Sequence, residues 1–407
     1  MVFRLQLTPL VLGMVLVAVS SILLVPTLIE AVGASAWAAF AVGQAVGGFC
    51  AVLILYGWGV EGPALVARAS VGDRRRLVLS SLRLRWSISA PVLITGGLLL
   101  LALTDSHRVL AVAGMLTNGL AGLGMTWFFL GVKDGWSVFI TDSMPRSLGN
   151  VLGILLLQED SETAFASGMA VLVLAPLFGC LHGWLRATNS VGCALRQAFA
   201  HSPDDSIGAL LGRGKHSVST SFTGSIYTLS PVIIIAGSGA PSAPLFVLVD
   251  KAQKQLLSAF APVANVLQAW VPRAREKELL KRVFVAALAA ALFASGSLMC
   301  SALFGVPALE WLSAGTVSVS SSVAAWAGLY LGLALAEVIL GRSCLVAIGA
   351  VSRLSFWSFV GAAIGLALLL PAGMAWGAAG ALGAVSLGQG VRVCGYLFVI
   401  WSWKRRG

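Results

Sequence analysis

Charged residues are scarce in this sequence: aspartate, glutamate, lysine and arginine make up 11% of the 407 residues. Soluble domains carry roughly 25% charged residues. A soluble fold also could not hide a chain that is 58% hydrophobic, because the surface area per residue falls too slowly with size. This scarcity excludes a soluble protein and indicates a chain whose solvent is lipid.

Cysteine and histidine are also few, with six and four copies. The cysteines form no close pairs, and neither residue type shows the spacing of metal ligands. We therefore interpret the cysteines as small apolar packing residues. We expect no metal site and no cofactor, apart from a coupling ion such as H⁺ or Na⁺.

Long apolar runs, in contrast, are abundant. Each is long enough for the roughly 20 residues that a membrane helix needs. The runs predict an all-α integral membrane protein with about twelve transmembrane helices. The expected spans are 8–31, 34–56, 86–104, 109–131, 136–157, 163–185, 216–238, 243–267, 283–304, 322–341, 351–370 and 376–401.

The net charge of +11 would suggest a nucleic-acid partner in a soluble protein, but here the basic residues mark one side of the membrane. With the N-terminus in the cytoplasm, only Arg108 falls in an outer loop. The loop after the second span is strongly basic and includes Arg83 and Arg85. We therefore expect both termini in the cytoplasm and no nucleic-acid partner.

The longest polar stretch, about 186–215, separates six spans from six spans. It predicts an N-terminal six-helix bundle over residues 1–200 and a C-terminal six-helix bundle over 201–407. The halves also resemble each other weakly: Gly33 leads to Gln44 through Phe40 much as Gly239 leads to Asp250 through Phe246. Internal symmetry of this kind is expected of transporters.

The eighth span holds Asp250, Lys251 and Lys254. A charge at the centre of a bilayer costs about 2.5–3.5 kcal/mol on insertion scales, so such residues point to function. Two interpretations stay open. The lysines line a wet cavity, or Asp250 neutralises Lys254 at i, i+4 and both merely pack.

Further polar residues interrupt other spans. Asp142 and Arg146 stand at i, i+4 in the fifth span and form either a structural pair or an anion site. Arg392 in the last span either reaches the cavity or pairs with Glu337 of the tenth. The remaining candidates are Gln44 in the second span and, in the seventh, Tyr227 on one face with Thr220, Thr223 and Ser230. Interhelical hydrogen bonding is the alternative for these residues.

Several short motifs resemble bacterial Wzx-type polysaccharide flippases. They are 127–131 (Trp-Phe-Phe-Leu-Gly) with Arg146 in the next helix, 56–58 (Tyr-Gly-Trp), 246–251, 261–262, 271–273 and 377–381. The chain departs from that pattern at Gly59, Ala64 and Leu130, where relatives often carry Asn, Arg and Gln.

The resemblance implies the multidrug/oligosaccharidyl-lipid/polysaccharide exporter (MOP) superfamily, with a MATE-like fold of two six-helix bundles around a central cavity. It implies a flippase of the bacterial cytoplasmic (inner) membrane and not an enzyme. The cargo would be a polyprenyl-diphosphate-linked oligosaccharide, moved from the cytoplasmic to the outer leaflet by alternating access. Expected partners are membrane lipid, this lipid-linked glycan, a polysaccharide polymerase and glycosyltransferases.

On this hypothesis the anionic diphosphate meets a cationic passage. The candidate substrate-binding residues are Arg146, Lys251, Lys254, Gln44, Tyr227 and Arg392. The candidates for ion coupling are Asp142, Asp250 and Glu337, because a buried carboxylate is able to hold a proton.

Three alternatives remain open at this stage. A drug antiporter of the same fold would favour acidic cavities, whereas cations match or outnumber acids here. A major-facilitator transporter is suggested by Asp73-Arg74, but Ala69 and Arg76 replace the glycines of its loop motif. A membrane-embedded sugar transferase or ligase would gather catalytic residues at one face, and the outer loops show no such motif.

Overall fold

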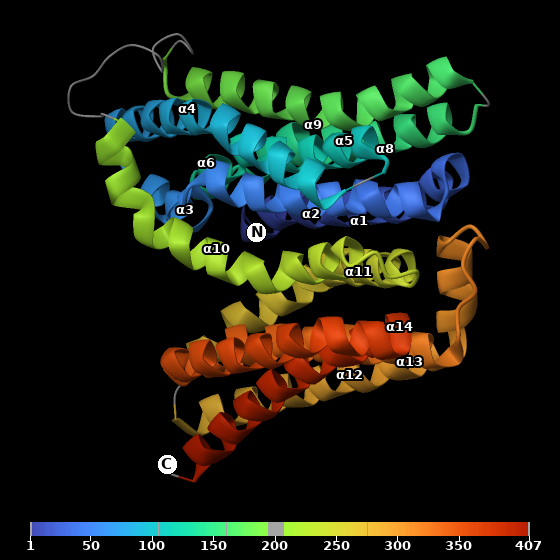
Figure 1. Ribbon diagram of the computed structural model, residues 1–407. Helices are drawn as coiled ribbons and strands as arrows, with labels where there is room; N and C mark the ends of the chain where they lie inside the picture. The colour runs from blue at the N-terminus through green and yellow to red at the C-terminus, as the bar shows by residue number, and fades with distance from the viewer. Residues whose placement is uncertain (1, 105, 160, 194–206, 275, 406–407) are drawn as a thin grey trace. The chain divides into compact units, whose positions relative to one another are not determined.

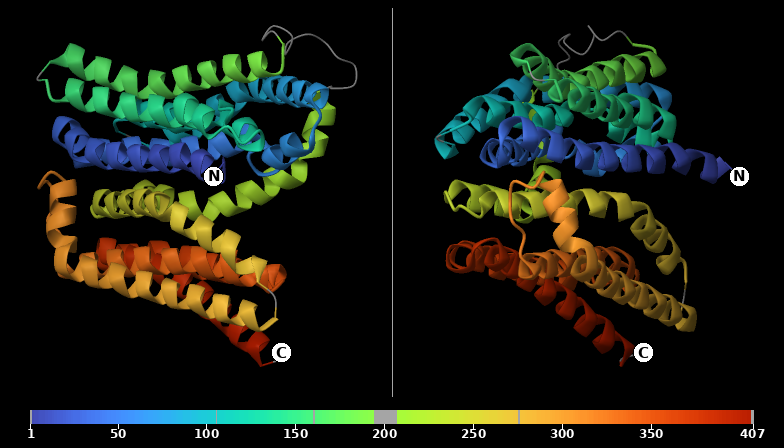
Figure 2. Two further views of the ribbon diagram at one scale, coloured as in Figure 1. Left: turned by 180° about the vertical axis from the view of Figure 1, so that it is seen from behind. Right: turned by 90° about the vertical axis from the view of Figure 1, so that its right-hand side faces the viewer.

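The computed structural model describes residues 2–104, 106–159, 161–193, 207–274 and 276–405, and within these ranges the chain is almost entirely helical with no strand. The chain folds as two compact units, Met1–Ile233 and Ile234–Gly407. The expected boundary at residue 200 falls in 194–206, outside the described residues. Figure 1 labels the helices and colours them along the chain, and Figure 2 shows the same colours from two further sides.

The first unit begins with three long membrane helices and one short helix and then continues through shorter helical pieces. Its elements are α1 (Val2–Val32), α2 (Ala34–Leu55), α3 (Trp58–Arg68), α4 (Val71–Leu103), α5 (Arg108–Gly119), the 3₁₀ turn η1 (Leu120–Leu123), α6 (Thr126–Gly131), α7 (Gly135–Val138), the π-helix η2 (Phe139–Ser143), α8 (Met144–Leu157) and α9 (Glu162–Ser190). Helix α10 (Ile207–Gly237) carries the boundary between the units.

The second unit is built from fewer and longer helices. They are α11 (Ala243–Trp270), the 3₁₀ turn η5 (Val271–Arg273), α12 (Glu276–Leu312), α13 (Ser321–Ile339), the π-helix η6 (Leu340–Leu345) and α14 (Val351–Lys404). Helix α14 is two membrane segments joined at a kink. Trp376 and Gly377 leave the helical conformation there, and Gly377 adopts φ 61°, which glycine tolerates without steric cost.

All twelve predicted spans lie on helical segments of the structure. Among the described residues, eight helices are long and apolar enough to cross a membrane by themselves, counting α14 once. The span expected at 136–157 is assembled from α7, η2 and α8. The protein is therefore an all-α, multi-pass membrane protein.

Serine caps start several of these helices. The hydroxyl oxygens of Ser70, Ser161 and Ser320 accept the backbone N–H three residues further on, at 3.2, 3.1 and 3.4 Å. Each cap satisfies one of the N–H groups that a helix leaves unpaired at its start. The caps fix where α4, α9 and α13 begin.

The fourth span is interrupted in its second half. Helix α5 passes into η1, the chain leaves helical geometry at Gly124, and α6 begins at Thr126. An interruption inside a membrane exposes carbonyl groups that need donors. Arg85 of α4 supplies them, as described below.

Candidate functional site

Asp250 of α11 is the centre of a polar cluster inside the second unit. Its Oδ2 lies 2.5 Å from the ammonium of Lys254, and its Oδ1 accepts a hydrogen bond from the Tyr330 hydroxyl of α13 at 3.3 Å. Lys251, also on α11, is half-buried and lies within electrostatic reach of both Asp250 and Lys254. The structure thus forms the i, i+4 pair and keeps a second lysine beside it.

The two partners of this pair differ in exposure. The side chain of Lys254 is 27% exposed, whereas that of Asp250 is 3% exposed. The carboxylate of Asp250 is buried against Lys254 and Tyr330, and the lysine side chain is the more exposed member of the pair.

Glu337 of α13 and Arg392 of α14 form the second pair of this unit, with Nη1 and Oε1 2.7 Å apart. The exposure is reversed here, because Arg392 is 7% exposed and Glu337 is 20% exposed. Of the two alternatives left open for Arg392, the structure forms the pairing with Glu337. The carboxylate is the accessible member of this pair.

Gln389, Arg392 and Tyr396 share a buried face of α14. The Tyr396 hydroxyl lies 2.7 Å from the hydroxyl of Ser358 on the first segment of the same helix. Polar groups thus run through the interior of the second unit, where each buried donor or acceptor needs a partner.

The first unit holds a third pair, on η2 and α8. Arg146 Nε lies 3.0 Å from Asp142 Oδ1, and the two side chains are about equally exposed, at 29% and 34%. Both lie within electrostatic reach of Cys180 on α9. Asp142 stands in a π-helix, a geometry that is frequent at functional sites.

Arg85 of α4 is completely buried, so its prediction as a cytoplasmic loop residue is wrong. Its Nη1 donates to the carbonyls of Gly122 and Gly124 at 3.1 and 2.6 Å, and its Nη2 lies 2.9 Å from the Met125 sulfur. The guanidinium therefore satisfies the carbonyls exposed where the fourth span breaks. Trp127, also buried, lies with its ring centroid 6.0 Å from the guanidinium.

Arg85→Met should destabilise the first unit. The change leaves the carbonyls of Gly122 and Gly124 without their donor, and a buried unsatisfied polar group costs about 1–3 kcal/mol. We expect a clear fall in melting temperature of the purified protein. Arg83→Met is the matched control because Arg83, two residues away, is only half-buried. Equal melting temperatures for the two variants would contradict the assigned role.

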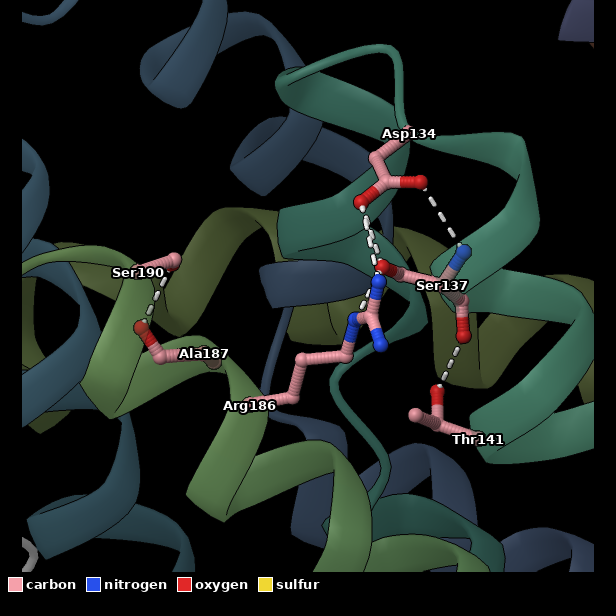
Figure 3. Close-up of polar contacts among 6 residues, drawn as sticks. All are labelled: Asp134, Ser137, Thr141, Arg186, Ala187 and Ser190. Atoms are coloured by element: carbon pink, nitrogen blue, oxygen red, sulfur yellow. Dashed lines mark hydrogen bonds and ion pairs between the residues drawn. The ribbon is translucent and has the colours of Figure 1, made fainter.

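A polar cluster that sequence analysis missed joins α7 to the end of α9 (Figure 3). Asp134 caps α7 by accepting the Ser137 N–H at 2.9 Å, and the Ser137 hydroxyl donates to the same carboxylate. Arg186 Nε donates to the Ser137 hydroxyl at 2.6 Å, and its Nη2 lies 4.0 Å from Asp134. The Asp-x-x-Ser spacing is the signal that would have indicated this cap.

The other candidate residues lie in the first unit. Gln44 is half-buried, and its backbone carbonyl accepts a hydrogen bond from Asn118 at 2.9 Å. Tyr227 and Ser230 of α10 are half-buried, whereas the side chains of Thr220 and Thr223 lie outside the described residues. Within the described part of the chain, no three His, Cys, Asp or Glu side chains gather as a metal site would require.

Comparison with known proteins shows similarity at the level of structure. No protein-family model matches the chain, and no curated protein matches it. Solved structures do match over nearly the full length. The similarity therefore lies in the arrangement of helices.

Three of these structures illustrate the likeness. The lipid II flippase MurJ in an inward closed conformation has a TM-score of 0.70 at 12% identity, covering 98% of this chain and 87% of that one. An inward-facing multidrug-resistance MATE-family transporter of the MOP superfamily has a TM-score of 0.67 at 16% identity, covering 96% of each chain. A MOP-superfamily transporter from Pyrococcus furiosus has a TM-score of 0.56 at 16% identity, covering 98% and 96%. At these identities the likeness shows the fold, and the chain has the MATE-like fold of MOP-superfamily transporters.

Proposed function

We propose that the protein is a flippase that moves a polyprenyl-diphosphate-linked oligosaccharide from the cytoplasmic to the outer leaflet of a bacterial inner membrane. It would work by alternating access along a cationic passage, with both termini in the cytoplasm. A MATE-like fold supports a transport role, and the lipid II flippase is one of the proteins that share it.

The partly exposed side chain of Lys254, paired with the buried carboxylate of Asp250, carries this proposal. A diphosphate is a concentrated anion, and a cation in partly desolvated surroundings attracts it more strongly than in water. Lys251 places a second basic side chain near Lys254 on α11. The four candidate cations, Arg146, Lys251, Lys254 and Arg392, also exceed the three candidate carboxylates, so anionic cargo is favoured.

We assign different roles to the three pairs on the basis of exposure. Lys254 and Arg146 would contact the diphosphate, because their side chains are 27% and 29% exposed. Arg392 would position Glu337, because it is the buried member of its pair. Gln44 and Tyr227, both half-buried, would contact sugar hydroxyls.

Ion coupling is part of the same proposal, with H⁺ or Na⁺ as the ion. Glu337 is the carboxylate best suited to it, because a coupling cation has to reach the group and Glu337 is 20% exposed. Asp142 is a second accessible candidate. Asp250 would serve only if Lys254 moved away from it.

The accessible carboxylate of Glu337 also favours a second function, an antiporter for small cationic molecules. A cationic cargo needs a carboxylate that it is able to reach from one side of the membrane. Among the three candidate carboxylates, Glu337 and Asp142 are partly exposed and meet this requirement. The two functions differ in the charge of the cargo.

A transport assay separates the two functions. The purified protein would be reconstituted in vesicles that carry a fluorescent polyprenyl-diphosphate oligosaccharide in one leaflet, and translocation followed by chemical quenching of the exposed label. We expect movement several-fold above protein-free vesicles and no uptake of a fluorescent organic cation under a proton or sodium gradient. Cation uptake without lipid translocation would contradict the flippase function and support the antiporter function.

A further inference from the structure

A groove on the second unit has none of the ion-paired residues described above in its lining. It encloses about 260 Å³ and is lined by parts of α11, α12, α13 and η6. Phe260 and Phe293 form one wall, with ring centroids 5.5 Å apart in an edge-to-face arrangement. Leu335 and Val338 of α13 continue the apolar lining. The shape and chemistry suit a hydrocarbon chain.

Arg342 also lines this groove. It is exposed, and within the part of the chain that the structure describes it makes no hydrogen bond or ion pair. It stands in the π-helix η6, which follows directly on α13. Among the described lining residues, Ser258 is the one polar residue apart from Arg342. A single guanidinium beside a mainly apolar groove is the pattern expected for an amphiphile with an anionic head.

Arg342 lies just beyond the end of α13, and its distance from the apolar lining matches a ligand with an anionic head and an apolar tail. Seven residues separate Leu335 from Arg342, and at 1.5 Å per residue this is roughly 10 Å. Arg342 belongs to the set of basic residues that marks the cytoplasmic side. The groove therefore extends from the inner headgroup level into the hydrocarbon layer.

We propose that this groove binds an anionic phospholipid of the cytoplasmic leaflet. The phosphate pairs with Arg342, whose planar fork fits phosphate geometry, and an acyl chain lies against Phe260, Phe293 and Leu335. A soluble phosphate would gain nothing from the apolar walls. A zwitterionic lipid would gain less from the guanidinium than an anionic lipid, because its own ammonium offsets the charge of its phosphate. Basic pockets between membrane helices on the cytoplasmic side bind headgroups in this way.

Binding there would act on the ion pairs through the helices that carry them. The groove is lined by α11 and α13 together, and Asp250 of α11 is hydrogen-bonded to Tyr330 of α13. A lipid that bridges the two helices stabilises their contact. The lipid would thereby favour the arrangement in which Lys254 is held by Asp250.

Native mass spectrometry of the purified full-length chain tests this proposal. Phosphatidylglycerol and phosphatidylcholine with the same acyl chains are titrated into delipidated protein. We expect one phosphatidylglycerol to bind about fivefold more tightly than phosphatidylcholine, the effect of one arginine near an anionic headgroup. Arg342→Gln should abolish that preference, and Arg342→Lys should keep most of it.

Matched controls make the result specific. Arg353→Gln should keep the preference, because Arg353 is an exposed arginine that does not line the groove. Ala264→Phe fills the groove and should weaken the binding of both lipids. An unchanged preference in Arg342→Gln would overturn the proposal. Displacement of phosphatidylglycerol by inorganic phosphate would show that the site binds a phosphate ion and not a lipid. Displacement by a trace of polyprenyl phosphate would show that the site binds the carrier lipid. Either outcome also overturns the proposal.

Discussion

Replacing Lys251 and Lys254 together by glutamine should lower translocation of the polyprenyl-diphosphate oligosaccharide by about 100-fold or more. A hydrogen bond to a charged group contributes about 1.5–3 kcal/mol, and 1.4 kcal/mol is a factor of ten. Two such contacts to the diphosphate would be lost, and glutamine keeps the approximate length of the side chain. The measurement is the quenching rate in reconstituted vesicles at matched protein content.

Two further variants separate substrate binding from structural damage. Lys254→Gln alone leaves Asp250 buried without its cation, which is costly for folding. The double change Asp250→Asn with Lys254→Gln removes both charges and should fold while it still fails to transport. Lys254→Arg retains the charge and should retain most of the activity.

An exposed lysine of the C-terminal segment provides the control for total charge. Lys404 is exposed at the end of α14 and is remote in sequence from Lys251 and Lys254, so Lys404→Gln should transport at the rate of the unchanged protein. Full activity in the Lys251 and Lys254 double variant would remove the cationic site from the mechanism. The fold would remain, and the cargo of the proposed transporter would have to be sought among neutral or cationic molecules.

Sequence reasoning located the membrane helices and two of the ion pairs because both depend on local patterns. Apolar runs of about 20 residues reveal a span by length and composition alone. The pairs of Asp142 with Arg146 and Asp250 with Lys254 follow from i, i+4 spacing on a helix. The pair of Glu337 and Arg392 was one of two open alternatives, since its members are 55 positions apart.

The role of Arg85 could not be predicted because its partners lie far along the chain. Gly122 and Gly124 are 37 and 39 positions away, and their carbonyls need a donor only because the fourth span breaks there. A hydropathy window counts Arg85 as a charge that ends a span. The structure instead carries α4 through it for 33 residues, from Val71 to Leu103.

Relative exposure within each pair was equally unpredictable, although the proposed function depends on it. The sequence offers a carboxylate partner to each of two cations, Asp250 to Lys254 and Glu337 to Arg392. Only the packing of α11, α13 and α14 shows that Lys254 is the exposed member of one pair and Glu337 the exposed member of the other. The proposed anion contact at one pair and the proposed cation coupling at the other both depend on that difference.

Gly47→Leu should prevent the first unit from folding. Helices α2 and α5 approach so closely that a Cβ at Gly47 would overlap the carbonyl oxygen of Met115, and one at Gly43 would overlap that of Ala111. Small residues four apart permit such backbone contact in membranes. The obstruction is backbone, which moves only with its whole helix.

The expected cost of Gly47→Leu is therefore at least that of overpacking a core, about 1–3 kcal/mol, added to the loss of the close helix contact. Total stability is only about 5–15 kcal/mol for ordinary proteins, so we expect little monodisperse protein on size-exclusion chromatography. Gly97→Leu is the control in the same unit, because its Cβ would meet only the flexible end of Met115, at 3.8 Å. Gly296→Leu in α12 meets nothing within 4 Å. Both controls should elute as the unchanged protein does, and a normal profile for Gly47→Leu would show that α2 and α5 are not packed through their glycines.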